Sequence, residues 1–537
     1  MNWKYRLESW LMRYINVLIV TYLSLRIFFF FHYPTTGYLQ AVVLVFLLAE
    51  AFFLFHAYGY FRYLRKVTQA RKNPVQEAEL PPLNSYPPVA IVVASYKEPI
   101  SVLEDTLICF HNLTYPNKQL YFLDDTRYDV PWSVPERAEQ YKKEVEDLCK
   151  SIDINLFRRK WHHAKAGMIN DFLDYIQGRK KEDFTLTRYD DSSWCGEEKY
   201  IIIFDADMNP LPNFVEPLVA RMESQPDVAL IQTPQYYTNF DQSRVAKAAS
   251  LMQVVFYEWI MEAKGLQNLT IFCGSNVILR VDAIREVGGI DLSSVTEDFA
   301  TTFNLHKKNW KSLYVNIPCA FGLGPEDLGA FFKQQDRWAR GTVAMLPKTI
   351  GTFLRHPFKF PLAFYWEYFL SSSYYLVGWM YLILMTGPVV YLLLDIRLYQ
   401  FPTWLYGVAM FPYTLASNFL FYWTLQQRGY HFKDLFLGTM LSFISTPVFM
   451  KASLQGLLGI KGHFVVTPKD VSTQLPLRDL WPQLTFCLVA FVTMVWGFLR
   501  LYYEGEPFFG LIFNLFWISF YFAIFSSIFY FNQPQKT

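Results

Sequence analysis

The chain has 537 residues, of which 52% are hydrophobic, 19% aromatic and only 18% charged. This balance lies between that of a soluble enzyme and that of a pure transporter, so it predicts a water-soluble domain joined to membrane helices. The formal net charge of +2 argues against a nucleic-acid partner, and the six scattered cysteines, which form no CxxC pair, favour a reducing compartment over a zinc site or a disulfide scaffold.

Apolar stretches lie near both ends of the chain, and each is long enough for the ~20 residues that a helix needs to cross a bilayer. They cover roughly residues 14–31, 38–61, 365–394, 403–425, 480–503 and 508–531, which predicts about six spans, two before and four after a long polar region. The first stretch is not a cleavable signal peptide, because the second follows at once and no small-residue cleavage site precedes it. Arg26 lies inside the first stretch, where it either snorkels to the interface or faces a polar path through the bundle.

The distribution of Lys and Arg predicts the orientation of these spans. The loop 32–37 has neither residue, whereas basic residues precede the first stretch and follow the second. By the positive-inside rule, both termini, residues 62–364 and the loop 426–478 are cytoplasmic in a protein of the plasma (inner) membrane. The predicted units are a membrane segment 1–64, a Pro-rich linker 65–88, a soluble domain 89–345, an interfacial amphipathic segment 346–364 and a second membrane segment 365–537.

Within the soluble region, short β-branched runs alternate with charged, helical stretches. The runs lie at residues 89–95, 119–125, 154–159, 200–207 and 228–233. Strands spaced by helical segments predict a mostly parallel α/β sheet, and such sheets bind nucleotides at the carboxyl ends of their strands.

Acidic residues follow three of these predicted strands. The strand ends read Ser95-Tyr96-Lys97-Glu98, Asp124-Asp125 and Asp205-Ala206-Asp207. Residues i and i+2 of a strand point to the same side, so Asp205 and Asp207 can hold one hard cation and, through it, a diphosphate. A D-x-D triplet alone also occurs by chance or as a helix cap, but three acidic strand ends together favour a metal–nucleotide site.

Further motifs follow in a fixed order along the chain. They are HAKAG at 163–167, QTP at 232–234, FCGS at 272–275, TED at 296–298, QQDRW at 334–338 and FVVTPK at 464–469. Taken as an ordered set, they resemble the processive, membrane-embedded family 2 glycosyltransferases, most of all bacterial cellulose synthase catalytic subunits, over about residues 89 to 478. The resemblance implies an α/β GT-A glycosyltransferase domain at 89–345 inserted into a transmembrane helix bundle, a UDP-sugar donor, Mg²⁺ or Mn²⁺, and a bundle through which the growing polymer leaves the cell.

The resemblance also assigns roles to individual residues. The UDP-binding set is Tyr96, Glu98, Asp125, Lys165, Asp205, Gln334 and Arg337, with Asp205 and Asp207 at the metal. The acceptor-binding set is Phe272, Cys273 and Trp338, and the gating loop over the donor contains Phe464, Val466, Thr467 and Lys469. A purely structural role stays open for three of these residues: Tyr96 as a packing residue, Lys165 as a surface lysine at a helix start, and Trp338 as an interfacial anchor.

Asp298 is the predicted catalytic residue. A sugar hydroxyl is a poor nucleophile at neutral pH and needs a general base within hydrogen-bond reach. One carboxylate base without a protein nucleophile implies a single inversion, so an α-linked donor gives a β-linked product. Thr296-Glu297-Asp298 is also typical of a helix N-cap with an acidic first turn, and both interpretations can hold together. His162 and His163 are interpreted as structural, because consecutive side chains diverge and no third ligand is evident.

Several departures from the cellulose synthase pattern limit the product assignment. Lys97 stands where Asn is usual, Thr126 stands where Gly is usual, and residues 177–199 are an insertion. No cyclic-di-GMP-binding domain follows the last span, so we expect no regulation by that nucleotide in cis. The two-plus-four arrangement of spans is more like that of hyaluronan synthase.

The expected function is therefore an inverting, processive glycosyltransferase that makes a β-glucan, either cellulose or a 1,3- or mixed-linkage glucan, from UDP-glucose. The alternatives are a hyaluronan- or chitin-type synthase that uses UDP-GlcNAc, a non-processive lipid-linked transferase, and a non-catalytic relic. The expected partners are the donor, the growing glucan and the lipid bilayer, with no nucleic acid. Accessory secretion subunits and a homo-oligomer stay open.

Overall fold

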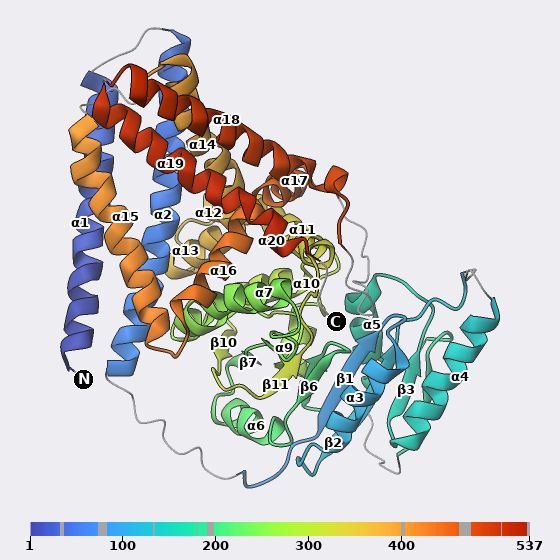
Figure 1. Ribbon diagram of the computed structural model, residues 1–537. Helices are drawn as coiled ribbons and strands as arrows, with labels where there is room; N and C mark the ends of the chain where they lie inside the picture. Colours follow the sequence, from blue (N-terminus) through green and yellow to red (C-terminus); the bar gives the residue numbers. More distant parts are fainter. Residues whose placement is uncertain are drawn as a thin grey trace.

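The computed structural model describes residues 2–32, 37–72, 83–130, 132, 135–179, 181–190, 198–398, 403–460, 474–505 and 507–533. Long helices from the two ends of the chain form a bundle, and the middle of the chain forms an α/β domain below it (Figure 1). The helices labelled α7, α10, α11 and α16 lie where the two parts meet (Figure 1).

The α/β domain is built on an eight-stranded sheet with the order β10-β7-β9-β5-β1-β2-β3-β4. Its strands are β1 (Val89–Ser95), β2 (Lys118–Asp124), β3 (Asn155–Arg158), β4 (Thr185–Thr187), β5 (Tyr200–Phe204), β7 (Val228–Gln232), β9 (Val277–Arg280) and β10 (Lys311–Tyr314). Only β4 and β9 run antiparallel to their neighbours. A mostly parallel sheet with the five expected strands is therefore confirmed, and the two antiparallel strands make it a mixed one.

Apolar residues on both faces of the sheet explain its position in the domain. Along β1, Val89, Ile91 and Val93 enter one hydrophobic cluster, and Ala90 and Val92 enter another. A strand that is buried on both faces reads as a continuous apolar run, which is typical of a sheet covered by helices on both sides. The covering helices are α3 (Ile100–His111), α4 (Pro135–Ser151), α6 (Val215–Ser224) and α7 (Arg244–Val255) on one face, and α5 (Ala164–Ile176) and α9 (Val281–Glu286) on the other.

The strand directions bring the polar motifs to one edge of the sheet. Because β1, β2, β5 and β7 run parallel, their carboxyl ends meet there. Strand β9 runs the opposite way, so the segment that precedes it, residues 272–276, arrives at the same edge. A second sheet at this edge has the order β6-β11-β8. Its strands are β6 (Met208–Pro210), β11 (Ala320–Gly322) and β8 (Tyr236–Tyr237).

Five of the described helical segments are long and apolar enough to cross a membrane. They are α1 (Asn2–His32), α2 (Tyr38–Lys72), α13 (Leu362–Ser373) with η2 (Tyr374–Leu376) and α14 (Val377–Leu394), η3 (Leu477–Leu480) with α18 (Trp481–Tyr503), and α19 (Phe508–Ser526) with α20 (Ile528–Phe531). A sixth is counted if α16 (Phe432–Ile444) and α17 (Thr446–Leu457), which are bent by 50°, form one broken span. The expected number of about six spans therefore agrees with the five to six candidate spans among the described residues.

The identity of the sixth span differs from the expectation. The stretch 403–425 forms the helix α15 (Thr403–Gln426), but it is not among the five. Asn418 and several hydroxyl-bearing residues interrupt its apolar character. The bent pair lies instead in the region 426–478, which was expected to be a cytoplasmic loop with an interface helix.

Arg26 is paired inside the bundle. Its Nε donates to Glu50 Oε2 at 2.7 Å, and Tyr22 donates to Glu50 Oε1 at 2.7 Å. The arginine and the glutamate are only 3% and 4% exposed. A buried charge held in this way faces a partner helix and does not snorkel to the interface, and a polar path past Arg26 stays a prediction.

Helix α10 (Glu297–Lys307) is anchored to the membrane helices. Phe299 and Phe303 pack in one cluster with Phe364 and Tyr368 of α13. Buried His306 contacts Tyr368 through Nδ1 at 2.7 Å and Ser312 through Nε2 at 2.7 Å. Burial lowers the pKa of His306 to about 3, so the ring stays neutral and α10 is held by neutral hydrogen bonds.

A strongly amphipathic helix, α12 (Leu346–Arg355), lies in the segment expected at the membrane surface. Leu354 is 71% exposed and Phe358, just beyond the helix, is 97% exposed. Such exposed apolar side chains are typical of a helix that lies in a bilayer interface. The interfacial position stays a prediction.

Candidate active site

Asp205 and Asp207 follow β5 at the polar edge of the sheet. The Asp205 side chain is 44% exposed and forms an ion pair with Lys165. The Lys165 ammonium group also donates to the carbonyl oxygen of Gly274 at 2.7 Å. The Asp205 amide donates to Ser275 Oγ at 2.9 Å. Lys165 therefore joins the predicted cation site to the segment 272–275.

The start of α5 explains why Lys165 reaches this position. His163 and Ala164 have φ angles of 51° and 44°, so the chain turns sharply into the helix. His162 Nε2 lies 2.6 Å from Oδ2 of buried Asp171, which agrees with a structural role for this histidine.

Asp298 lies across Gly274 from Lys165. Gly274 has a φ of +82°, and a Cβ atom there would lie 3.3 Å from Asp298 Oδ2. The Phe299 amide donates to Asp298 Oδ1 at 2.7 Å. Burial raises the pKa of Asp298 to about 7, the neighbouring Glu297 adds to the rise, and Phe299 N–H, Lys165 and Arg337 oppose it. A carboxyl group with a pKa near neutrality is well suited to accept a proton at physiological pH.

Thr296 stands at the N-cap position of α10, as predicted, but its side chain makes no capping hydrogen bond. Its amide donates instead to Ser294 Oγ at 3.2 Å. A Cβ atom on Gly341 of the helix α11 (Leu328–Ala344) would lie 2.9 Å from that amide nitrogen. The absence of a side chain at Gly341 therefore lets α11 pack directly on the Thr296-Glu297-Asp298 segment.

Helix α11 carries the predicted Gln334, Arg337 and Trp338. Gln334 forms a hydrogen bond with buried Tyr237, whose pKa is raised by burial and by Asp207 and Asp205. Arg337 lies close enough to Glu297 and Asp298 to lower the pKa of both. Trp338 is half-buried. The structure thus brings Gln334 and Arg337 to the same site as the carboxylates.

The proposed donor end of the site lies after β1 and β2. Buried Asp125 is 3.2 Å from the guanidinium group of Arg159, and burial raises the pKa of Asp125 to about 7 although Arg159 opposes the rise. Asp124 is committed elsewhere, since it accepts hydrogen bonds from Tyr128 at 2.9 Å and from Arg158 at 2.8 Å. The two adjacent aspartates therefore have different partners, and the UDP-binding role of Asp125 stays a prediction.

Tyr96 and Glu98 are half-buried at the end of β1. Between them, Lys97 adopts a left-handed conformation with a φ of 55° and places its ammonium group 3.9 Å from the centre of the Trp132 ring. The unusual lysine of this motif is thus accommodated by a cation–π contact.

The two predicted acceptor residues of the FCGS segment have different surroundings. Phe272 is 3% exposed and packs in the core under the sheet. The Cys273 amide donates to Gln232 Oε1 at 2.9 Å, and burial raises the pKa of its thiol well above the usual range. Gln232 also donates to the Ser275 carbonyl oxygen at 2.7 Å. The acceptor roles of Phe272 and Cys273 stay predictions.

Tyr237 is a residue that the sequence analysis missed. It lies on β8, accepts a hydrogen bond from Gln253 and contacts Gln334, which links β8, α7 and α11. Its position three residues after the QTP motif was the available signal. The predicted gating residues Phe464, Val466, Thr467 and Lys469 lie outside the described residues.

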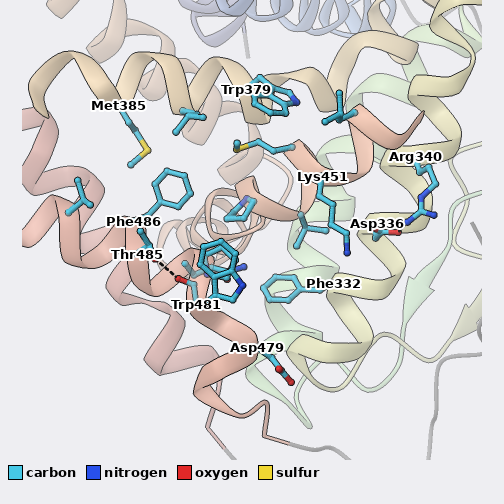
Figure 2. A pocket seen from close by; sticks show the side chains of 18 of the residues that line it. Phe332, Asp336, Arg340, Trp379, Met385, Lys451, Asp479, Trp481, Thr485 and Phe486 are labelled. Carbon is cyan, nitrogen blue, oxygen red and sulfur yellow. Dashed lines mark hydrogen bonds and ion pairs between the residues drawn. The ribbon is translucent and has the colours of Figure 1, made fainter. Parts of the chain in front are cut away.

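A cavity of about 1160 Å³ continues from this site into the helix bundle. Val295, Gln334 and Arg337 line it on the side of the carboxylates. Figure 2 shows Trp379 of α14 and Trp481 of α18 on opposite walls, with Phe332 and Asp336 of α11 at one end. Aromatic rings with a few polar groups are typical of a cavity that binds a large organic ligand.

Comparison with known proteins agrees with this geometry. Residues 90–288 match the model described as "Glycosyl transferase family 2", and residues 200–421 match "Glycosyl transferase family group 2". The chain carries a family 2 glycosyltransferase domain. The matched residues include both aspartates of the D-x-D triplet, Asp298 and α11. With the mixed sheet and its surrounding helices, this confirms the predicted GT-A-type core next to membrane-capable helices.

Relatives of this glycosyltransferase include cellulose synthase catalytic subunits. One from Pseudomonas fluorescens (strain SBW25) is 25% identical over 365 residues, which is 67% of this chain and 44% of the relative. One from Komagataeibacter xylinus is 30% identical over 280 residues, 50% of this chain and 33% of the relative. "Cellulose synthase 2" of Novacetimonas hansenii is 24% identical over 431 residues, which is 77% of this chain and 24% of the relative. The chain thus spans less than half the length of these curated relatives.

A solved mannosyltransferase from Pyrobaculum calidifontis, in complex with GDP-Man and Mn²⁺, is also similar to the glycosyltransferase. It is 14% identical, with a TM-score of 0.48, and covers 79% of this chain and 100% of its own.

The Lys165–Asp205 pair leads to a first prediction. Lys165→Met removes the ammonium group that competes with a cation for Asp205, so Mn²⁺ alone should bind roughly fivefold more tightly, as expected for a partly exposed pair. UDP release from a donor should fall about 100-fold, because the variant lacks the ammonium group that we expect to lie near the leaving diphosphate. Electron paramagnetic resonance of free Mn²⁺ and an assay of UDP release measure the two effects. Unchanged Mn²⁺ affinity would contradict the competition.

Proposed function

We propose that this glycosyltransferase is an inverting, processive enzyme that polymerises a β-glucan from UDP-glucose and moves the product across the membrane through its own helix bundle. The observation that carries the proposal is the grouping of Asp205, Lys165, Asp298 and Arg337 at one sheet edge, beside an aromatic cavity that enters the bundle. The names of the cellulose synthase relatives, which are "UDP-forming", support the choice of donor.

In this proposal Asp298 accepts the proton of the acceptor hydroxyl as that oxygen attacks the anomeric carbon. The bond from the anomeric carbon to the diphosphate oxygen breaks in the same displacement, and its electron pair leaves with UDP. Lys165 and Arg337, whose charges already act on Asp298, offset the charge that develops on the leaving group. Burial of Asp298, which keeps its pKa near 7, makes it a competent base at neutral pH.

The residues present fit a divalent cation. Among the described residues no group of three or more His, Cys, Asp or Glu side chains could hold a metal ion. Two carboxylates suffice for Mg²⁺, which keeps several waters and shares its coordination with substrate phosphates. Asp205 and Asp207 would hold it, and when bound it would neutralise charge on the diphosphate. Mn²⁺ suits the same oxygen ligands.

The donor end of the site is proposed to contain the nucleoside. Asp125, buried at the end of β2, would accept a hydrogen bond from the base, and Tyr96 and Glu98 would contact the uridine from the end of β1. Trp338 and the FCGS segment would face the acceptor. This leaves the cavity beyond Gln334 and Arg337 for the growing chain.

The aromatic lining of that cavity supports processivity and translocation. Trp379, Trp481, Phe332 and Phe486 offer flat apolar faces on which sugar rings can stack, and they come from α11, α14 and α18 (Figure 2). A polymer seated there keeps its new end near Asp298 after each addition. The basic residues near the start of α1 and near the end of α2 support a plasma (inner) membrane location with a cytoplasmic catalytic domain.

The test is an incubation of the purified full chain with UDP-[¹⁴C]glucose and Mg²⁺ or Mn²⁺, beside parallel reactions with UDP-GlcNAc and UDP-glucuronate. We expect labelled product of high molecular weight that a β-glucanase degrades. Incorporation from UDP-GlcNAc instead would favour a chitin- or hyaluronan-type synthase. A labelled lipid would favour a non-processive transferase, and no UDP release from any donor would contradict the proposal.

A further inference from the structure

A π-helical turn lies where the α/β domain meets the membrane helices. The segment η1 (Phe256–Met261) interrupts the path between α7 and α8 (Glu262–Gly265). Turns of this kind are rare and are frequently found at functional sites. Here three consecutive side chains, those of Tyr257, Glu258 and Trp259, contact three different parts of the protein.

On the membrane side, the turn is held by Arg428, which follows α15. Arg428 is 6% exposed and forms ion pairs with Glu258 and, at 3.0 Å, with Glu262. Its guanidinium group also lies 3.8 Å from the centre of the Trp259 ring. Arg71 at the end of α2 forms a second ion pair with Glu262 at 3.2 Å. Two segments of the helix bundle therefore hold the π turn and the helix α8 that directly follows it.

On the side of the active site, the turn contacts two segments that carry site residues. The Tyr236 hydroxyl donates to Glu258 Oε1 at 2.7 Å, and the next residue, Tyr237, contacts Gln334. Tyr257 forms a hydrogen bond with the thiol of Cys273, which directly precedes Gly274. A displacement of the turn would thus move the Cys273 segment, next to Asp298, and the Tyr236–Tyr237 segment, next to α11.

We propose that Arg428 and Glu258 are positioning residues of the transfer reaction, which fix the π turn against the membrane helices and thereby hold the Cys273 and Tyr236–Tyr237 segments in reactive geometry. The proposal rests on the proposed function for its kinetic readout. A buried ion pair by itself is weak evidence for a stabilising role, since desolvation offsets much of the attraction. The links of this pair to Tyr236 and, through the same turn, to Cys273 give it a different role.

The expected effect is on kcat. The contacts of the turn reach the acceptor side and α11, whereas the expected nucleoside contacts, Tyr96, Glu98 and Asp125, follow the strands β1 and β2. A misplacement of about 1 Å far from the chemistry can cost roughly 10²-fold. Arg428→Met and Glu258→Gln should each lower kcat for UDP release by about 30- to 100-fold, with UDP affinity changed by less than about threefold. The double variant should lose little more than either single variant, because both break one link.

Arg428→Lys is the conservative variant. Lysine keeps the charge but lacks the planar fork that bridges two carboxylates and stacks on Trp259, so we expect only partial recovery of kcat. The matched control is Lys247→Met, which breaks an ion pair of 3.1 Å between α7 and Asp434 of α16 at the same junction. This control should keep kcat within about twofold, as expected for a half-exposed pair.

A second readout does not require activity. Peptide-resolved alkylation with N-ethylmaleimide should label Cys273 about tenfold faster in Arg428→Met than in the unmodified chain, because Tyr257 no longer holds the thiol. A tenfold change in rate corresponds to a decrease of ~1.4 kcal/mol in the free energy of local opening. Buried Cys319 is the internal reference and should not change. Thermal unfolding in detergent shows how much protein remains folded.

The outcomes separate the two proposals. If the unmodified chain releases no UDP, the proposed function fails, and the labelling rate of Cys273 still decides whether the turn is linked to the site. If the unmodified chain is active but Arg428→Met keeps its kcat, or loses activity only in proportion to lost folded protein, the positioning role is overturned. An equal loss in Lys247→Met would overturn it as well.

Discussion

Asp298→Asn is expected to lower the rate of UDP release by about 10³-fold, the contribution typical of a general base, while UDP affinity changes by less than about threefold. The substitution keeps the shape of the side chain and its hydrogen bond from Phe299 N–H but removes the basic oxygen. UDP affinity should be largely preserved, because the expected nucleoside contacts Tyr96, Glu98 and Asp125 follow β1 and β2, whereas Asp298 lies on α10. Radiometric product formation and calorimetric titration with UDP measure the two quantities.

Glu297→Gln is the matched control for this variant. Glu297 is adjacent to Asp298 and lies in the same field of Lys165 and Arg337, so it tests which of the two carboxylates is the base. We expect Glu297→Gln to retain substantially more turnover than Asp298→Asn. Normal polymerisation by Asp298→Asn, or an inactive Glu297→Gln beside an active Asp298→Asn, would show that the base is wrongly assigned.

The pH profile gives an independent check on the same residue. Since burial raises the pKa of Asp298 to about 7, the base is protonated and inactive below that pH and ionised above it. The rate of UDP release should therefore rise with pH and level off above about 7. Arg337 opposes the rise of this pKa, so Arg337→Met should move the rising limb to higher pH. A limb that stays near pH 4 in the unmodified chain would contradict a perturbed base.

Asp207→Asn is the second change with a large expected effect. With two carboxylates as the proposed cation ligands, the loss of one should lower turnover by about 10³-fold and weaken UDP binding in the presence of Mn²⁺ by roughly tenfold. UDP binding without a divalent cation should change little. In Asp207→Asn, the UDP affinity measured with Mn²⁺ should therefore be close to the UDP affinity measured with EDTA.

Asp124→Asn is the control for an acidic residue at the same sheet edge. Asp124 is engaged by Tyr128 and Arg158, so its replacement should lower stability without altering the cation dependence of UDP binding. If Asp207→Asn keeps the full effect of Mn²⁺ on UDP affinity, the D-x-D triplet does not hold the cation.

The sequence predicted those parts of the fold that depend on local pattern. The five runs that became β1, β2, β3, β5 and β7 are short and mostly apolar, and acidic motifs follow β1, β2 and β5. β9 was not recognised as an antiparallel insertion between β5 and β7, because strand direction is decided by long-range pairing rather than by composition. That insertion is nevertheless what brings Gly274 to the site.

The candidate site was predictable where motifs mark it and not elsewhere. Lys165, Asp205, Asp298 and Arg337 belong to motifs with fixed spacing, and the structure brings them together. Tyr237 and Arg428 carry no motif that distinguishes them from packing residues, so only their contacts reveal a role. Helix α15 shows the converse problem, since a stretch of sufficient length was expected to be a span although its polar residues reduce its apolar character.

The Arg26–Glu50 pair has a consequence for how the protein enters the membrane. An arginine in the apolar part of a lone helix raises the free energy of insertion by the translocon, by up to about 2.5–3.5 kcal/mol at the helix centre. Glu50 of α2 neutralises that charge at 2.7 Å, but α2 is synthesised only after α1. The two helices are therefore released into lipid most favourably as a preassembled hairpin, so biogenesis of the N-terminal half depends on a contact that forms between the first two segments to be made.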